Sequence, residues 1–199
     1  MKKQIIVIHG GDTFRTYKEY LKFLKTIELD FDRFKSGRKE WKTSLGEKLG
    51  RNFEVVLPAM PNKINAKYPE WKIWFEKLTP HIKSGVVLVG HSLGGIFLAK
   101  YLSENKSPKK IKAVFLVAAV YDKDSDGHPV LSFSLPQKLN LKTKKIYLYH
   151  SKDDPIVPFS ALEKYRKLLP EAEVRVFKNK GHFNEETFPE IVKDIKSLY

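Results

Sequence analysis

Short apolar runs alternate along the chain with longer stretches in which apolar residues recur every three or four positions. The short runs are continuous rather than alternating, which is typical of parallel strands that are buried on both faces. They predict strands over Gln4–His9, Phe53–Leu57, Val86–Val89, Ile111–Ala118, Lys145–His150 and Glu173–Phe177. Strands that are separated by helical stretches in this way indicate an α/β fold.

The helical periodicity is clearest over Tyr68–Ile82, where Trp71, Trp74, Phe75, Leu78 and Ile82 fall on one face of the predicted helix. Shorter helices are expected over Ile96–Ser103, Ser160–Leu169 and Pro189–Leu198. Proline residues stand near the ends of several of these elements, where they disturb hydrogen bonding least.

Two connections are too long for simple crossovers between strand and helix. Residues 12–52 contain an amphipathic pattern around Tyr17–Ile27, with Tyr20, Leu24 and Ile27 on one side, and a second short helix over Ser44–Gly50. Residues 121–143 are rich in Pro, Asp and Ser. Loops of this length in a single domain are usually functional. We therefore expect residues 12–52 to form an inserted flap and residues 121–143 a small lid, both within one domain over residues 1–199.

Composition excludes several classes of protein. With 42% hydrophobic residues, the 199-residue chain can bury a core and is not intrinsically disordered. It has no cysteine, which removes disulfides, thiolate metal sites and cysteine nucleophiles, and favours a non-oxidising compartment. The longest apolar run, Ala113–Val120, is far shorter than a membrane span. We expect a soluble cytoplasmic protein with no membrane partner.

The net charge of +14 raises the question of a nucleic-acid partner. However, the basic residues form no continuous arm, and only six of the 37 are arginine, the residue that most often makes bidentate phosphate and guanine contacts. We interpret the excess of lysine as a solvated surface and expect no specific nucleic-acid partner.

The sequence Gly90-His-Ser92-Leu-Gly94-Gly95 lies directly after a predicted strand and before a predicted helix. A Gly-x-Ser-x-Gly turn in this position forces the serine backbone into a strained conformation and presents its hydroxyl at the carboxyl edge of the sheet. Ser92 is therefore the candidate nucleophile.

A nucleophilic serine needs a base and an acid that orients the base, and in this architecture they follow in the order Ser, Asp, His. Asp153 and Asp154 come after the strand Lys145–His150, and His182 comes after the last strand. The Asp-x-x-Val-Pro spacing favours Asp154 over Asp153 as the acid. His150 could hydrogen-bond the acid loop.

Acyl transfer also needs two backbone N–H groups to hold the developing oxyanion. One is expected from Leu93, and the other from the loop after the first strand, where Gly11 is preferred and Asp12 is the alternative. A phosphate-binding glycine loop is not indicated, because neither of its consensus patterns is present.

No metal or cofactor is expected. Asp122-Lys-Asp-Ser-Asp-Gly127 begins like a calcium-binding loop, but its twelfth position is Phe133 instead of the required Glu. No histidine pair has the spacing of a zinc site.

With these motifs the chain resembles the α/β-hydrolase superfamily, and within it the small serine hydrolases similar to retinoblastoma-binding protein nine. The matching segments are Ile5–Gly10, Leu57–Asn62, Trp71, Gly90–Gly95, Ser151–Pro158 and Gly181–Phe183. The resemblance implies a six-stranded parallel core without a large cap domain. It also implies a triad of Ser92, Asp154 and His182, and cofactor-free hydrolysis of small esters or amides.

The chain departs from this family in two places. The stretch from Thr13 to about Lys39 looks like an insertion relative to compact members of the family. We expect its aromatic residues either to line an apolar acyl pocket or to cover the core; they are Phe14, Tyr17, Tyr20 and Phe23. The mammalian retinoblastoma-binding motif contains a cysteine, so that partner is not implied here.

The sequence as a whole predicts a serine hydrolase that forms an acyl-enzyme. The alternative is a catalytically weak protein of the same fold that binds an acidic partner through its basic surface.

Overall fold

A computed structural model of the chain describes all residues except 1, 30, 32–39, 108 and 122–129. Its centre is a six-stranded parallel sheet with the order β2-β1-β3-β4-β5-β6. The strands are β1 (Lys3–Ile8), β2 (Phe53–Val56), β3 (Val86–His91), β4 (Ile111–Val117), β5 (Ile146–Ser151) and β6 (Glu173–Phe177). All six predicted strands are therefore present, with ends that differ by one or two residues.

The helices follow the sequence prediction closely. They are α1 (Tyr17–Thr26), α3 (Trp41–Leu49), α4 (Tyr68–Leu78), α5 (Leu93–Glu104), α6 (Ser160–Leu168) and α7 (Pro189–Ser197). Two short 3-10 helices, Thr79–His81 and Leu131–Phe133, complete the described elements. Helix α3 begins three residues earlier than expected and α5 begins at Leu93 instead of Ile96.

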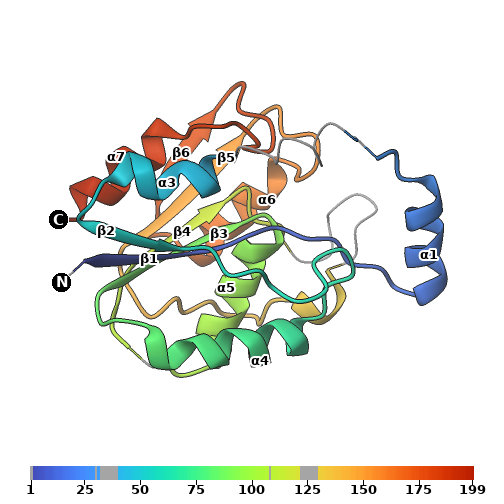
Figure 1. The fold of residues 1–199 in the computed structure, drawn as a ribbon, viewed down its shortest axis with the longest axis horizontal. Coiled ribbons are helices and arrows are strands. Elements are labelled where there is room, and N and C mark those ends of the chain that lie inside the picture. Colours follow the sequence, from blue (N-terminus) through green and yellow to red (C-terminus); the bar gives the residue numbers. More distant parts are fainter. Residues whose placement is uncertain (1, 30, 32–39, 108, 122–129) are drawn as a thin grey trace.

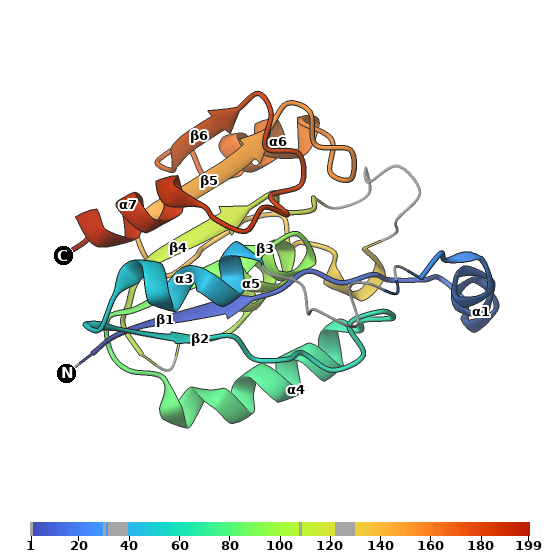
Figure 2. The ribbon, with the colours of Figure 1, turned by 45° about the horizontal axis from the view of Figure 1, so that its top comes forward.

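The sheet separates two apolar layers (Figures 1 and 2). Helices α4, α5 and α6 cover one face, where Trp71, Phe75 and Phe97 are almost completely buried. Helices α3 and α7 cover the other face with Trp41 and Ile191. Burial of both faces explains the continuous apolar runs of the central strands. The prediction for Trp74 was wrong: it is 45% exposed on the flank of α4.

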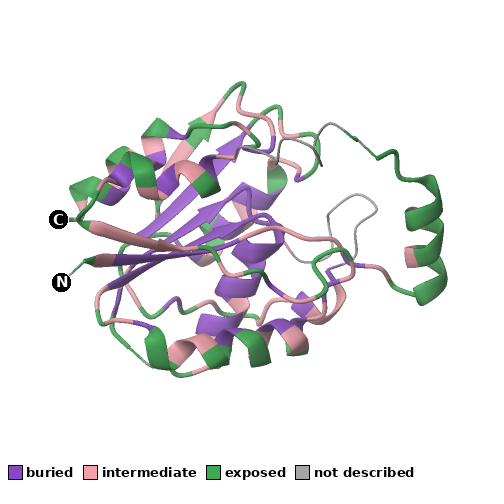
Figure 3. Ribbon diagram, in the orientation of Figure 1, coloured by how far each residue is buried: buried purple, intermediate pink, exposed green. Residues whose placement is uncertain are grey.

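Helix α1 is the exception to this layered arrangement. It lies beyond the carboxyl edge of the sheet, at the far end of the molecule from both termini (Figure 1). None of its residues is buried, whereas the central strands and α5 are almost entirely buried (Figure 3). No helix in the described part of the chain is long and apolar enough to cross a membrane.

Candidate active site

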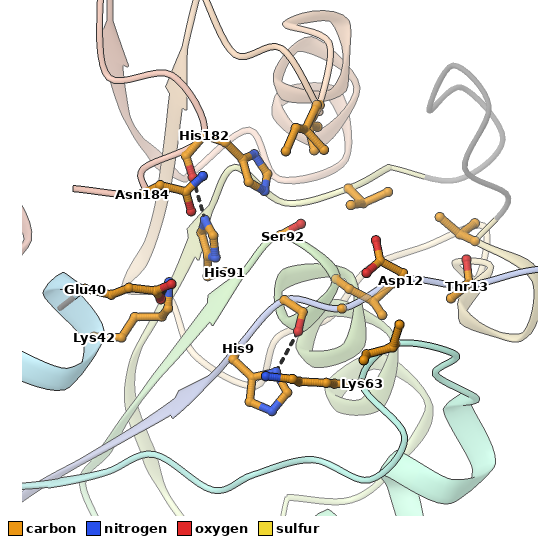
Figure 4. A pocket seen from close by; sticks show the side chains of 18 residues that line it. His9, Asp12, Thr13, Glu40, Lys42, Lys63, His91, Ser92, His182 and Asn184 are labelled. Carbon is orange, nitrogen blue, oxygen red and sulfur yellow. Dashed lines mark hydrogen bonds and ion pairs between the residues drawn. The ribbon is translucent and has the colours of Figure 1, made fainter. Parts of the chain in front are cut away.

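The direction in which successive strands are added to the sheet reverses between β1 and β3. The chain passes from β1 outward to β2, but from β3 it continues in the opposite direction, and parallel sheets bind ligands at the carboxyl end of such a reversal. A cavity of about 360 Å³ opens there, between the segments that follow β1 and β3 (Figure 4). It is lined by residues 9–13, 40, 42, 63, 64, 91–93, 120, 130, 156, 157, 182 and 184.

Ser92 occupies the turn between β3 and α5 and has the strained backbone that the sequence predicts, with φ 55° and ψ −120°. The neighbouring glycines are required by close backbone packing. A Cβ atom on Gly90 would lie 2.4 Å from the carbonyl oxygen of Gly94, and one on Gly94 would lie 2.2 Å from the carbonyl oxygen of Ile8. The turn therefore tolerates no side chain at either position, and it exposes Ser92 to the cavity.

His182 lines the same cavity, and its ring lies next to the Ser92 hydroxyl in Figure 4. Its Nδ1 atom is 2.9 Å from Oδ2 and 3.1 Å from Oδ1 of Asp154. Because a carboxylate accepts, this contact fixes the proton on Nδ1 and leaves Nε2 directed away from the acid. A neutral imidazole held in this tautomer can accept a proton at Nε2.

Asp154 is held in place by its own loop. Its side chain is completely buried, and Oδ1 also accepts hydrogen bonds from the backbone N–H groups of Ile156 (2.9 Å) and Val157 (3.0 Å). As the sequence suggested, His150 supports this loop, since its Nε2 donates to the carbonyl oxygen of Val157 at 3.0 Å. Burial is the main cause that lowers the pKa of His150, so the ring is neutral.

The neighbouring Asp153 has a different set of contacts. Its carboxylate accepts from the Ser151 hydroxyl and from the backbone N–H of Gly181 at 3.0 Å. These hydrogen bonds, that of Ser151 foremost, lower the pKa of Asp153. Asp153 thus joins the end of β5 to the loop that carries His182, whereas Asp154 contacts the imidazole itself.

Gly11, Asp12 and Leu93, the residues considered as donors to the oxyanion, all line the cavity together with Ser92. Leu93 is the first residue of α5, and the first N–H groups of a helix have no acceptor within it. The N–H of Asp12 already donates to the carbonyl oxygen of Lys63 at 2.8 Å, which removes the alternative donor considered from the sequence. Gly11 lies next to Leu93, and a Cβ atom there would lie 2.5 Å from the Lys63 carbonyl oxygen.

The lining of the cavity is mixed in character. Leu93, Val120, Val130, Ile156 and Val157 are apolar. Charged residues also line the cavity, and sequence reasoning did not identify Glu40, Lys42 and Lys63 among them. There Lys42, although only 6% exposed, contacts the Glu40 carboxylate at 2.6 Å, and Lys63 also lines the cavity.

Three further residues that hold the site together were not assigned a role from the sequence. His91 Nε2 donates to the carbonyl oxygen of His182 at 2.8 Å, and the Trp41 indole donates to that of Phe183 at 2.9 Å. His9 accepts from the backbone N–H of Met60 at 2.9 Å. The sequence did offer a signal for His91 and His9, because both lie within the glycine motifs at the ends of their strands.

The aromatic residues of the insertion are not where either prediction placed them. Phe14, Tyr17, Tyr20 and Phe23 contact one another and neither line the cavity nor enter the core. Both expectations were wrong because α1 lies outside the body of the domain. The calcium-like sequence Asp122–Gly127 and the part of the proposed lid over residues 122–129 lie outside the described residues. Of the described residues on either side, Val120 and Val130 line the cavity.

In the described part of the chain no three His, Asp or Glu side chains are grouped to hold a metal ion. His150 and His182 are both engaged by the hydrogen bonds given above.

The chain is similar in sequence to known serine hydrolases. A model of the serine hydrolase family matches residues 34–192. The serine hydrolase RBBP9 of Rattus norvegicus is 26% identical over 151 residues, which cover 73% of this chain and 78% of the rat protein.

Two solved bacterial structures share the fold. The ydeN gene product of B. subtilis superimposes with a TM-score of 0.69 at 19% identity, covering 99% of this chain and 98% of that one. A YdeN-like hydrolase from Pectobacterium atrosepticum gives 0.66 at 14% identity, covering 99% and 90%. The single-domain α/β-hydrolase architecture expected from the sequence is therefore confirmed.

Proposed function

The chain belongs to the serine hydrolase family, and from this premise we propose that it hydrolyses small esters or amides through an acyl-enzyme formed on Ser92. The observation that carries the proposal is the buried Asp154–His182 pair, whose imidazole faces the same cavity as a serine on a strained turn. We propose Ser92 as nucleophile, His182 as general base and acid, and Asp154 as the residue that orients His182.

In the first half of the reaction, His182 Nε2 takes the proton of the Ser92 hydroxyl as Oγ attacks the carbonyl carbon of the substrate. The proton then passes from Nε2 to the leaving alcohol or amine, and the acyl group remains on Ser92. Asp154 holds the Nδ1 proton throughout and stabilises the imidazolium. In the second half, water attacks the acyl carbon by the same proton transfers and releases the acid.

The negative charge that develops on the carbonyl oxygen needs fixed donors. We propose the backbone N–H groups of Leu93 and Gly11 for this role. Their support is the position of Leu93 at a helix N-terminus, the place of both residues in the cavity lining, and the hydrogen bond from the Asp12 N–H to Lys63. No step of this mechanism calls for a cofactor.

The cavity of about 360 Å³ suits a small substrate. We propose a carboxylesterase-like activity in which the apolar lining residues contact the acyl chain and the charged ones contact the more hydrophilic part of the substrate. A cytoplasmic location is proposed as well, supported by the cysteine-free sequence.

The proposal is tested by reaction with a fluorophosphonate, which phosphonylates an activated serine, followed by intact mass. Wild-type protein should gain one adduct, Ser92→Ala none, and His182→Ala one at a much lower rate. The melting temperature of Ser92→Ala should stay close to wild type. Absence of any adduct on folded wild-type protein would overturn the proposal and favour the alternative of a binding protein without activity.

A further inference from the structure

Helix α1 carries an apolar face that the described chain leaves uncovered. Tyr17 is 68% exposed, and Leu21, Leu24 and Ile27 are each close to 40% exposed. Leu29 and Phe31, just beyond the helix, are about 70% exposed. Figure 3 shows α1 as an exposed element at the edge of an otherwise well-packed domain.

The exposure is organised, since apolar and basic residues occupy different sides of α1. Tyr17, Leu21 and Leu24 are spaced four and three residues apart and therefore share a face, which Tyr20 and Ile27 extend. Lys18, Lys22 and Lys25 repeat with the same spacing on another face. This arrangement is typical of helices that bind at an interface rather than within a core.

The helix is well defined locally but lacks tertiary support. The Thr16 hydroxyl accepts from the backbone N–H of Glu19 at 3.1 Å and caps the first turn, while Phe14 packs on Tyr20 and Phe23. A ten-residue helix is marginal in water without packing of its apolar face. The sequence thus encodes a capped amphipathic helix on whose apolar face Leu21, Leu24 and Ile27 stay about 40% exposed.

Charge decides which partner fits this face. The helix itself contains three lysines and one glutamate, and the whole chain has a net charge of +14. Two copies of so basic a protein repel each other, whereas an anionic surface attracts both the helix and the domain behind it. Tyrosine and lysine side chains also suit the boundary between lipid and water, because each combines an apolar body with a polar end.

We propose that α1 docks this protein on anionic lipid surfaces, with Tyr17, Leu21 and Leu24 inserted among the lipids and the lysines at the headgroups. The sequence analysis expected no membrane partner because no segment can span a bilayer. A helix lying in the plane of the surface does not need to span it.

The position of α1 gives this docking a consequence for the cavity. Residues 11–13, which lead into α1, and residues 40 and 42, which follow the insertion, all line the cavity. Docking through α1 therefore brings the segments that carry the cavity close to the lipid surface. This consequence rests on the proposed function, but the docking itself does not.

Binding is tested by cosedimentation of the full chain with vesicles of phosphatidylcholine alone and with about one third phosphatidylglycerol. We expect binding to the anionic vesicles, at least about tenfold weaker to the neutral ones, and reduced by salt at about 0.5 M, where surface charges are screened. Binding without substrate keeps this test separate from activity, so a protein that fails to react with fluorophosphonate can still bind, and the reverse.

Two variants with the same change of charge separate the apolar face from general attraction. Leu24→Asp should weaken vesicle binding at least about tenfold, whereas Thr26→Asp, on the polar side of the same turn, should weaken it no more than about threefold. Neither should shift the melting temperature, since α1 contributes no buried residue. Equal losses in both variants, no binding to anionic vesicles, or a dimer that Leu24→Asp dissociates would overturn the proposal.

Discussion

The Nε2 atom of His91, the residue before the candidate nucleophile, donates a hydrogen bond to the backbone carbonyl of His182 at 2.8 Å. The two rings are also in contact, with centroids 4.8 Å apart, and the edge of Trp41 packs against His91. The turn that carries the candidate nucleophile is therefore connected directly to the loop that carries the candidate base. Because the acceptor is a carbonyl, the Nε2 atom of His91 must bear a proton.

This relationship predicts a positioning role for His91. His91→Ala leaves the buried His182 carbonyl without its donor, which should lower the free energy of unfolding by about 1–3 kcal/mol. The rate of fluorophosphonate labelling should fall by about tenfold because the loop that carries His182 is no longer hydrogen-bonded to the turn that carries Ser92. Labelling kinetics and urea unfolding measure the two effects.

His91→Gln is the matched variant, because its amide N–H₂ reaches about as far as Nε2 and restores a donor. It should recover most of the labelling rate. If His91→Gln labels as slowly as His91→Ala while both remain folded, the hydrogen bond is not the feature that matters.

The same substitution at the two adjacent aspartates should have effects of very different size on the labelling rate. Asp154→Asn removes the charge that holds the Nδ1 proton of His182, and should slow fluorophosphonate labelling by on the order of 10³–10⁴. Asp153→Asn keeps an oxygen that can accept from Ser151 and Gly181, so labelling should change by less than about threefold. Comparable losses in the two variants would contradict the assignment of Asp154.

Two glycines of similar sequence surroundings predict opposite changes in stability. Gly94→Ala places a Cβ atom 2.2 Å from the carbonyl oxygen of Ile8, and moving the backbone to relieve this contact should cost about 1–3 kcal/mol or more. Gly46→Ala, within α3, places its Cβ at an ordinary 3.6 Å from Val55 and should stabilise the helix by about 0.5–1 kcal/mol. Urea unfolding distinguishes them, and a Gly94→Ala variant as stable as wild type would show that the turn is not tightly packed.

The elements that sequence predicted well are those that a short continuous stretch of the chain identifies by its own pattern of apolar residues. Continuous β-branched runs fixed the strands, and parallel strands share a carboxyl edge, so Ser92, Asp154 and His182 could be expected around one site. The start of α5 was placed too late because Gly94 and Gly95 are poor helix formers. The contacts that require them, with the end of β1 at Gly94 and with Ala119 at Gly95, are tertiary.

What sequence could not predict depends on contacts between distant segments. The periodicity of Tyr17–Thr26 identified a helix and its apolar face, but a periodicity does not say against what that face packs. Likewise Glu40 and Lys42 lie between β1 and β2, whereas Lys63 lies between β2 and α4, and only the folded chain brings all three to the cavity.

A half-buried histidine, His9, and a buried one, His150, predict how stability depends on pH. Burial is the main cause that lowers the pKa values of His9 and His150 below the ordinary 6.5. His9 is also hydrogen-bonded at both ring nitrogens, and its Nε2 accepts from Met60 and so cannot carry a proton. Between pH 6.5 and the lowered values, the unfolded chain therefore binds more protons than the folded protein.

The free energy of unfolding should accordingly fall as the pH drops below about 6.5, with a slope of up to about 1.4 kcal/mol per pH unit for each histidine. His9→Gln keeps an acceptor for Met60, and His150→Gln keeps a donor for Val157, but neither glutamine titrates. Urea unfolding from about pH 5 to 7.5 should therefore give a shallower slope in each variant than in wild type. A slope unchanged by both substitutions would mean that the two rings take up protons in the folded protein as easily as in the unfolded chain, and would contradict the lowered pKa values.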